Sequence, residues 1–380
     1  MRRTLLPVLS AVLVVGACST AEGSAPQSET GSNVSSLTYV DSITVPDATS
    51  PFGVPFGGIS GIDRSEETGR YLATSDDRSE KGPARFYELE LVLDDAGHFT
   101  STTPNVTAMT VYKDPQGIPF APKGVDPESI RRVPGSADVL VSSEGDASNM
   151  LSPFVARFAP DGSHIRDYPL PVAYVPDASV LRGVRNNLAL EGLTVTADGS
   201  TITALTENAL VQDGDAATTD AVSRSRAVVF DSASAGVEAE FVYEVDPIGG
   251  PYPDVVDPAT AYTLKADRGA SELLAIDDTD YLVVERGLIP GSGNTVQVYR
   301  ASTVGATNVA GKESLDGSEA PMTKALLFDF AVTGENPDNV EGISWGPTLA
   351  DGTRTVMLCA DDNFNAAGGQ HTMFHVLVVE

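Results

Sequence analysis

Five segments of this chain repeat one pattern, in which two apolar stretches flank a turn and acidic residues stand near the ends. The segments begin at positions 60, 128, 191, 272 and 341, so the spacing between them runs from 63 to 81 residues. That period is long for a small solenoid repeat, but it accommodates a four-stranded antiparallel unit with its loops. The repeat therefore predicts five similar sheets.

Each repeat also contains two further strand-like stretches, for example residues 84–91 and 106–112 in the first unit. The fifth unit has only residues 371–380 left for its outer strands, and the unassigned stretch 37–45 can supply the missing one. Pairing of this kind ties the chain ends together and leaves no open sheet edge. The sequence predicts an all-β fold, a β-propeller of five four-stranded blades closed by an N-terminal strand, with five blades favoured over six.

The N-terminus has the order of a bacterial export signal over residues 1–17, with two arginines, an apolar run from 5 to 15 and then small residues. The run is too short to span a bilayer as a helix. The sequence Val-Gly-Ala-Cys resembles a lipobox and predicts a lipid on Cys18, while a plain secretory signal is the alternative. Residues 18–36 are polar and predict a flexible tether, with the folded domain over 37–380.

Net charge limits the partners of the chain. With 53 Asp and Glu against 24 Lys and Arg, the formal charge is −29, which repels a phosphate backbone, so no nucleic-acid partner is expected. We expect a monomer that is exported, either lipid-anchored in the bacterial cell envelope or secreted, and that meets the membrane only through its N-terminal lipid.

Acidic residues recur at both ends of the repeated hairpins. Because antiparallel strands bring the start of one and the end of the next together, these residues should ring the mouth of the propeller. The start positions are Ser60, Glu128, Glu191, Glu272 and Glu341, and the return positions are Asp76, Asp77, Glu144, Glu207, Glu285, Asp361 and Asp362. Carboxylates about 5 Å apart repel by roughly 3 kcal/mol at an effective dielectric near 20. Protonation or bound cations must compensate, and Ca²⁺ suits so many oxygen ligands best. The alternative is that these acids cap turns.

Several separated motifs resemble one known family. They are GGISGID with TGRYLATSDDRS, RNNLALEGLTVTADGS with LTENALVQDG, LVVERG, and NVEGISWGP with DDNF, and together they resemble the phytase-like (esterase-like phytase) family over about residues 56–380. The resemblance implies a phytase-like propeller domain over 37–380, a hydrolase acting on small phosphate esters or other anionic esters. It also implies family polar positions at Glu191, Glu207, Glu285, Glu341, Asp361, Asp362 and Asn363, accompanied by Arg185, Asn187, Arg286 and Lys324.

A calcium-assisted phosphoesterase would use these residues in three ways. The predicted metal ligands are Asp76, Asp77, Glu128, Glu144, Glu285, Asp361, Asp362 and Asn363. The predicted catalytic residues are Glu191, Glu207 and Glu341. The predicted substrate-binding residues are Arg185, Arg286, Lys324 and Asn187, although the cationic side chains could equally be salt-bridge partners of the acids.

Two other functional classes stay open. A non-catalytic propeller could bind a ligand or partner at the same mouth, and a glycosidase could use two ring carboxylates. A single Trp and 7% aromatic residues disfavour the glycosidase, because sugar platforms usually employ aromatic faces.

Three short motifs are rejected. Residues 342–346 fit G-x-S-x-G, but a turn and a second strand follow instead of the helix that a nucleophile elbow needs. His371 and His375 share one strand face without a second cluster, so zinc is not predicted. Asp213-Gly214-Asp215 lacks the remaining ligands of an EF-hand loop.

Overall fold

The computed structural model describes residues 34–47, 49–256 and 263–380. The predicted signal peptide over 1–17, the predicted lipid attachment at Cys18 and most of the predicted tether lie outside these residues. Within them, helical structure is confined to six short 3-10 turns. None of the described helices is long and apolar enough to cross a membrane.

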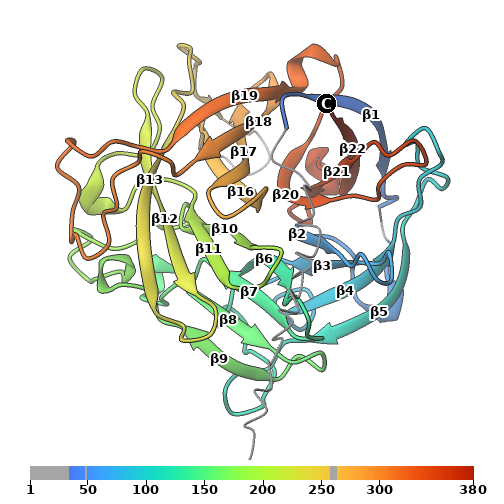
Figure 1. Cartoon of the computed structure of the whole chain (residues 1–380), viewed down its shortest axis with the longest axis horizontal. Helices are drawn as coiled ribbons and strands as arrows, with labels where there is room; N and C mark the ends of the chain where they lie inside the picture. The colour runs from blue at the N-terminus through green and yellow to red at the C-terminus, as the bar shows by residue number, and fades with distance from the viewer. Residues whose placement is uncertain (1–33, 48, 257–262) are drawn as a thin grey trace, which may run out of the picture. The chain divides into compact units, whose positions relative to one another are not determined.

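Five four-stranded antiparallel sheets surround a common axis (Figure 1). The first blade contains β2 (Ile59–Arg64), β3 (Tyr71–Ser75), β4 (Arg85–Glu90) and β5 (Asn105–Val111). The second contains β6 (Pro127–Arg132), β7 (Val139–Ser143), β8 (Phe154–Phe158) and β9 (His164–Tyr168). The third contains β10 (Leu190–Val195), β11 (Thr201–Thr206), β12 (Ser223–Asp231) and β13 (Val237–Val245). The fourth contains β16 (Gly269–Ala275), β17 (Asp280–Ile289), β18 (Gly293–Ser302) and β19 (Thr323–Asp329).

The fifth blade joins the two ends of the folded chain. It contains β20 (Asn339–Trp345), β21 (Thr355–Asp361), β22 (Met373–Val379) and, as its outer strand, β1 (Leu37–Thr44). β1 pairs with β22 from Leu37 opposite Val379 to Thr44 opposite Met373. The predictions of five blades and of closure by an N-terminal strand are confirmed.

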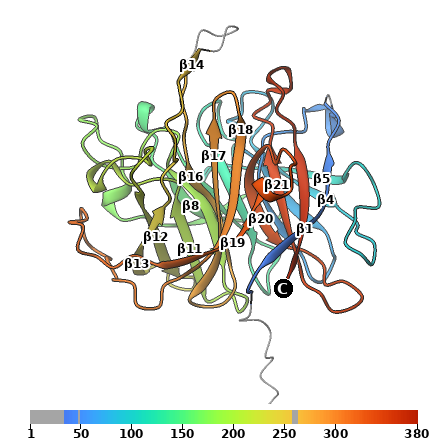
Figure 2. The same cartoon turned by 90° about the horizontal axis from the view of Figure 1, so that it is seen from above.

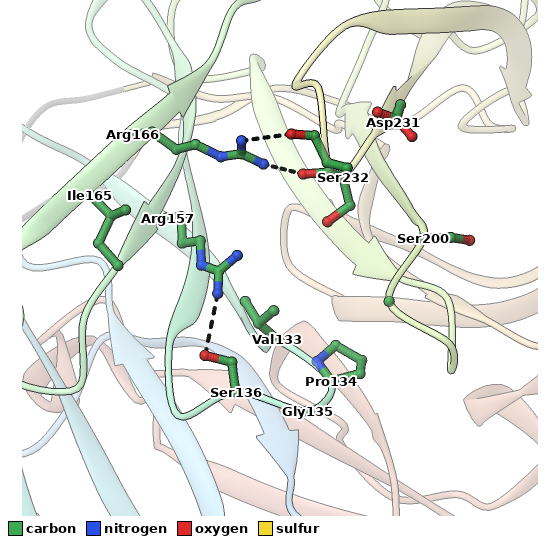
Figure 3. Close-up of a pocket in the computed structure, with 12 residues that line it drawn as sticks. Val133, Pro134, Gly135, Ser136, Arg157, Ile165, Arg166, Ser200, Asp231 and Ser232 are labelled. Carbon is green, nitrogen blue, oxygen red and sulfur yellow. Dashed lines mark hydrogen bonds between the residues drawn. The ribbon is translucent and has the colours of Figure 1, made fainter.

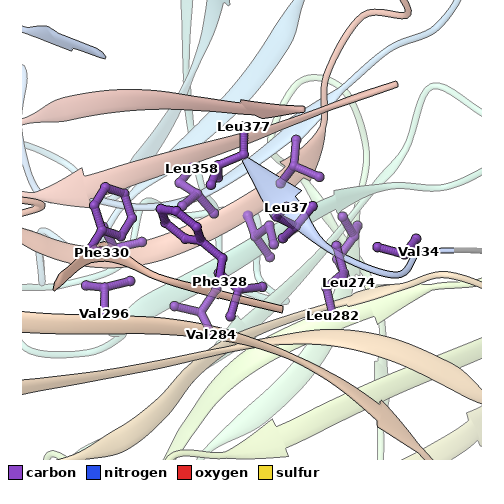
Figure 4. Close-up of a cluster of buried hydrophobic side chains, with 14 of the residues drawn as sticks. Val34, Leu37, Leu274, Leu282, Val284, Val296, Phe328, Phe330, Leu358 and Leu377 are labelled. Atoms are coloured by element: carbon purple, nitrogen blue, oxygen red, sulfur yellow. The ribbon is translucent and has the colours of Figure 1, made fainter. Parts of the chain in front are cut away.

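The hydrophobic core lies between successive blades, because each strand alternates side chains between the two faces of its sheet. Between the fourth and fifth blades, Leu274, Val284 and Phe328 pack with Leu358 and Leu377 (Figure 4). Val34 and Leu37 belong to the same cluster, so the start of the folded chain is anchored in it. Burial on both faces fixes the register of each strand, since a one-residue slip would expose its apolar side chains.

The innermost strands of the blades, β2, β6, β10, β16 and β20, contact one another around the axis. Their close approach explains a glycine in three of the repeats. A Cβ atom on Gly61 would lie 2.7 Å from Cα of Ser129, and one on Gly192 would lie 2.8 Å from a methyl carbon of Leu273. Glycine is therefore needed where neighbouring inner strands meet.

One element of the described chain was not predicted from the sequence, a small hairpin of β14 (Val255–Val256) and β15 (Thr263–Leu264) between the third and fourth blades. Figure 2 shows it standing out from the blades on the side away from the C-terminus. The G-x-S-x-G sequence ends β20 and is followed by a turn and β21, so the rejection of a nucleophile elbow is confirmed.

Candidate functional site

A β-bulge at the start of every inner strand sets which side chain faces the mouth. The pairing of inner and second strands skips one position of the inner strand in four blades, for example between Leu190 and Gly192, and leaves Glu128 and Ser129 unpaired in the second blade. The skipped residues of equivalent position are Ser60, Glu128, Glu191, Ser271 and Glu341. The prediction of Glu272 at the fourth start position is wrong by one residue, since Ser271 occupies it.

The return positions show the same shift in the fourth blade. In each blade, the return position is the residue of the second strand that follows the strand pair immediately before the bulge. These residues are Asp76, Glu144, Glu207, Arg286 and Asp361. Arg286, which is opposite Gly269, therefore takes the place predicted for Glu285. The mouth carries a ring of acids interrupted by two serines and one arginine.

Glu272 lies inside the central channel, below the mouth. Its Oε2 is 2.9 Å from Nη2 of Arg131, and both side chains are buried. It also accepts hydrogen bonds from the hydroxyl of Ser129 and the backbone amide of Leu193. The ion pair with Arg131 fills the channel, so it serves the packing of the inner strands.

Glu285 belongs to a separate buried network between the third and fourth blades. Its carboxylate contacts Nζ of Lys324 and Nε of Arg268, and it accepts a hydrogen bond from the hydroxyl of Tyr243. Lys324 also lies over the ring of Tyr299, 4.3 Å from its centroid. Both cations neutralise Glu285, so neither Glu285 nor Lys324 faces the mouth.

A cavity of about 780 Å³ opens at the mouth. Eight of the residues predicted from the sequence line it, namely Asp76, Glu128, Glu144, Asn187, Glu191, Arg286, Glu341 and Asn363. Asp361 is fully buried and accepts a hydrogen bond from the amide of Asn363, while Glu207 lies beside Arg286. The structure thus brings most of the predicted site together.

Three other predicted residues have structural partners away from the cavity lining. Asp77 is buried against Arg85, with Oδ2 2.6 Å from Nη1, and accepts hydrogen bonds from three loop amides. Asp362 accepts hydrogen bonds from the amides of Gly58 and Phe364. Arg185 donates to the carbonyl oxygens of Ala209 and Gly214. Each of these three side chains therefore has partners within the protein, and its position is explained without a bound ligand.

Sequence reasoning missed Asp126, which precedes β6 and joins Glu128 and Glu144 in a buried cluster. Each of the three carboxylates offers an oxygen, and these oxygens lie within 4.8 Å of one another. The signal was present in the sequence Asp-Pro-Glu-Ser at 126–129, since side chains two positions apart in an extended chain point to the same side. We call these three residues the acidic triad, and it can hold a metal ion.

Arg78 is the cation nearest to the acidic triad. Its Nε lies 3.3 Å from Oδ2 of Asp126, and its Nη2 donates to Oδ2 of Asp146 at 2.6 Å. One guanidinium shared between two carboxylates leaves the charge of Glu128 and Glu144 uncompensated. The sequence contained Arg78 directly after Asp76 and Asp77, but its role depends on a contact with the second blade.

Burial and mutual repulsion raise the pKa values of the mouth acids. Burial first, and then Glu144, raises the pKa of Asp126 to about 9. Burial also raises the pKa of Glu144 to about 7. The pKa of Glu128 is raised well above its usual value by burial and by Glu191. In the absence of a cation, the triad therefore holds protons near neutral pH.

A second group of acids surrounds Arg286. Its Nη2 donates to Oε1 of Glu341 at 2.9 Å, and its Nη1 lies 3.5 Å from Oε1 of Glu207. Burial raises the pKa of Glu207 to about 8, although Arg286 opposes the shift. Among the described residues, Oε2 of Glu207, Oδ1 of Asp76 and Oδ2 of Asp361 are buried without a hydrogen-bond partner. These oxygens are available to a cation or proton.

Another cavity, of about 610 Å³, lies at the opposite ends of the blade strands, between the second and third blades (Figure 3). Arg166 donates to the backbone oxygens of Ser232 and Ala233, and Arg157 donates to Ser136 and pairs with Asp138. The side chains of Arg157 and Arg166 are thus both bound to residues of the turns between strands. This cavity therefore lacks the uncompensated charge found at the mouth.

The family model described as phytase-like, with esterase-like activity of phytase, matches residues 54–364. The chain belongs to the phytase-like family. Family membership and the propeller fold together fit a hydrolase.

Solved structures resemble this chain only at low sequence identity and low TM-score. A calcium-binding protein, regucalcin, from Agrobacterium tumefaciens is 13% identical, with 89% of this chain and 96% of that chain covered and a TM-score of 0.40. A GH43_1 enzyme from Xanthomonas citri is 11% identical, with 90% of each chain covered and a TM-score of 0.44. With TM-scores this low, the five-blade assignment depends on the strand pairing itself. No curated protein matches the sequence.

Proposed function

We propose that the chain is an exported, metal-assisted phosphoesterase of the phytase-like family, with Ca²⁺ held at the acidic mouth. The single observation that carries the proposal is the acidic triad. Three buried carboxylates share one small volume with one partly committed cation, Arg78. Export and lipid attachment at Cys18 remain predictions from the N-terminal sequence.

The residues present fit a hard cation. Ca²⁺ binds six to eight oxygens at 2.3–2.6 Å, and oxygens within 4.8 Å of one another can share one such ion. Asp126, Glu128 and Glu144 would supply the first ligands, and water or substrate oxygens the others. Bound there, Ca²⁺ would supply Lewis-acid polarisation of a phosphoryl oxygen and offset the repulsion among the acids.

The remaining mouth residues divide the other tasks. Arg286 lines the cavity and can bind a phosphoryl oxygen, while Glu341 and Glu207 orient its guanidinium. Glu191 lines the cavity, and the surrounding acids and burial raise its pKa well above the usual value. Glu191 is therefore the group suited to hold or release a proton at its carboxylate oxygen during ester cleavage.

The test is phosphate release from p-nitrophenyl phosphate and phytate, with Ca²⁺ titrated against EGTA. We expect Ca²⁺-dependent release that Asp126→Asn and Glu144→Gln abolish. Glu67→Gln is the matched control, because Glu67 is exposed in the turn between β2 and β3. Absence of release from every ester, while Ca²⁺ still stabilises the protein through the acidic triad, would overturn the enzyme proposal. That result would favour the alternative of a ligand-binding propeller.

A further inference from the structure

The mouth cavity has two chemically different halves. The half formed by the first three blades carries the acidic triad with Asp76, Glu191 and Arg78. The half formed by the fourth and fifth blades is rich in uncharged amide side chains, which are Asn294, Asn336, Asn339, Asn363, Asn365 and Gln370. A ligand that fills the cavity must therefore match a cluster of buried acids at one end and a surface rich in amide side chains at the other.

The acids in the amide-rich half are already committed to the protein. Asp267 accepts a hydrogen bond from the amide of Leu288, and Asp338 accepts hydrogen bonds from the amides of Asn339 and His371. Glu341 pairs with Arg286. Asn294 and Asn339 each donate one hydrogen bond to these acids, to Oδ1 of Asp338 and Oε1 of Glu341. The charge of the acids is thus directed at donors of the protein.

Most of the amide groups retain hydrogen-bonding capacity. The Oδ1 of Asn336 accepts from the backbone amide of Asp338, and its amino group has no partner among the described residues. Asn365 donates to Oε1 of Gln370, whose amino group points to no acceptor in the described chain. An amide both donates and accepts, as a hydroxyl does, so a row of amides matches a row of hydroxyls.

Apolar side chains complete this half. Val255 and Leu264 reach the cavity from the β14–β15 hairpin, and Leu288 reaches it from β17. Alternating amide and aliphatic surface suits a polyol, which presents hydroxyl groups around apolar C–H faces. The cavity of about 780 Å³ has room for a group the size of a monosaccharide beside a phosphoryl group.

Charge also restricts the number of phosphoryl groups. Eight carboxylates line the cavity, but the cationic side chains in the described lining are two, Arg78 and Arg286. A polyphosphorylated ring would place several dianionic groups against the amide-rich half, where the described lining offers one cation, Arg286, which already pairs with Glu207 and Glu341. A single phosphoryl group at the acidic end avoids that cost.

Resting on the proposed function, we propose that the substrate is a phosphate monoester of a neutral, hydroxyl-rich alcohol, with its phosphoryl group at the acidic end and its alcohol against the amides. Hydrolysis would break the bond between phosphorus and the ester oxygen and form one between phosphorus and a water oxygen. One water proton passes to the released alcohol, and the products are the alcohol and inorganic phosphate.

Kinetics with Ca²⁺-loaded protein test the substrate class. We expect kcat/KM for glucose 6-phosphate to exceed that for phytate at least tenfold. Asn294→Leu and Asn336→Leu should each lower kcat/KM for glucose 6-phosphate about tenfold, which corresponds to one lost hydrogen bond of about 1.4 kcal/mol. For p-nitrophenyl phosphate, whose leaving group lacks the hydroxyls, the same variants should lower kcat/KM by a smaller factor. Gln116→Leu, an exposed amide outside the cavity, is the matched control.

A metal-independent measurement separates this inference from the proposed function. In EGTA, saturation-transfer NMR should detect methyl α-glucoside bound to the protein, and Asn294→Leu with Asn336→Leu should abolish the signal. Binding of the glucoside without hydrolysis of any ester would overturn the enzyme proposal and support the assignment of the amide-rich half. Preferred hydrolysis of phytate, or no amide-dependent binding of the glucoside, would overturn the inference while leaving phosphoesterase activity intact.

Discussion

Neutralising one acid of the triad should stabilise the metal-free protein by an amount that grows with pH. Glu128 is suited to this test, because its carboxylate accepts a hydrogen bond from the Ser60 hydroxyl that glutamine can also accept. In the native protein, burial and neighbouring acids raise the pKa of Glu128 well above 4.5. In the unfolded chain, it ionises near 4.5.

The magnitude follows from proton linkage. Between these two pKa values the native state binds one more proton than the unfolded state, so the free energy of unfolding falls by about 1.4 kcal/mol per pH unit. Glu128→Gln removes that loss. In EGTA, the advantage of the variant over the wild type should therefore be small at pH 5 and grow by up to about 1.4 kcal/mol with each pH unit above it.

Urea unfolding between pH 5 and 8 measures this difference directly. Saturating Ca²⁺ should narrow the difference, because the wild type gains about 2.7 kcal/mol at a hundred times the Kd and the variant lacks one ligand. Glu272→Gln is the matched control of opposite sign, since it leaves the buried Arg131 without its partner and should destabilise the protein. Equal stability of Glu128→Gln and wild type across this pH range in EGTA would refute the reasoning.

Three further perturbations probe other parts of the structure. Arg286→Met leaves Glu207 and Glu341 without their shared cation, so urea unfolding in EGTA at pH 8 should show a loss of about 3–5 kcal/mol; an unchanged midpoint would contradict this. Burial lowers the pKa of His375 to about 4, so on acidification the imidazole is protonated in the unfolded state before it is protonated in the native state. The free energy of unfolding should therefore drop by about 3 kcal/mol from pH 7 to 4. His375→Gln should lack that component, and parallel pH curves for the two proteins would exclude it. Gly342→Ala places a Cβ against Cys359 and 2.9 Å from the Ser60 carbonyl, and should cost about 1–3 kcal/mol in thermal unfolding. Cys359→Ala added to it should restore part of the loss.

Much of the architecture could be predicted from the sequence, because each repeat of the sequence corresponds to one blade. A segment that recurs five times with two strands and two acidic ends predicts five equivalent hairpins, whatever their packing. The shortage of strands in the last repeat, with the spare stretch at 37–45, predicted the closure that β1 and β22 make. Both inferences depend only on the number and order of the strands, which can be deduced from the amino-acid sequence.

Which residues line the mouth depended on the exact strand register, which the sequence pattern does not specify. Side chains alternate across a strand, so one position of error in the fourth repeat exchanges one face for the other. The bulge places Ser271 at the mouth and turns Glu272 into the channel toward Arg131. The same shift brings Arg286 into the ring and takes Glu285 out of it.

By itself, the sequence determined the all-β propeller, its closure and the presence of acids at one end of the hairpins. The tertiary structure alone decided which acids share a volume. Asp126, Glu128 and Glu144 form the acidic triad because the bulge in β6 and the end of β7 converge. The raised pKa values arise from burial and from distances of a few ångströms between carboxylates. Those distances are set by the packing of strands around the axis, and residue order alone does not specify them.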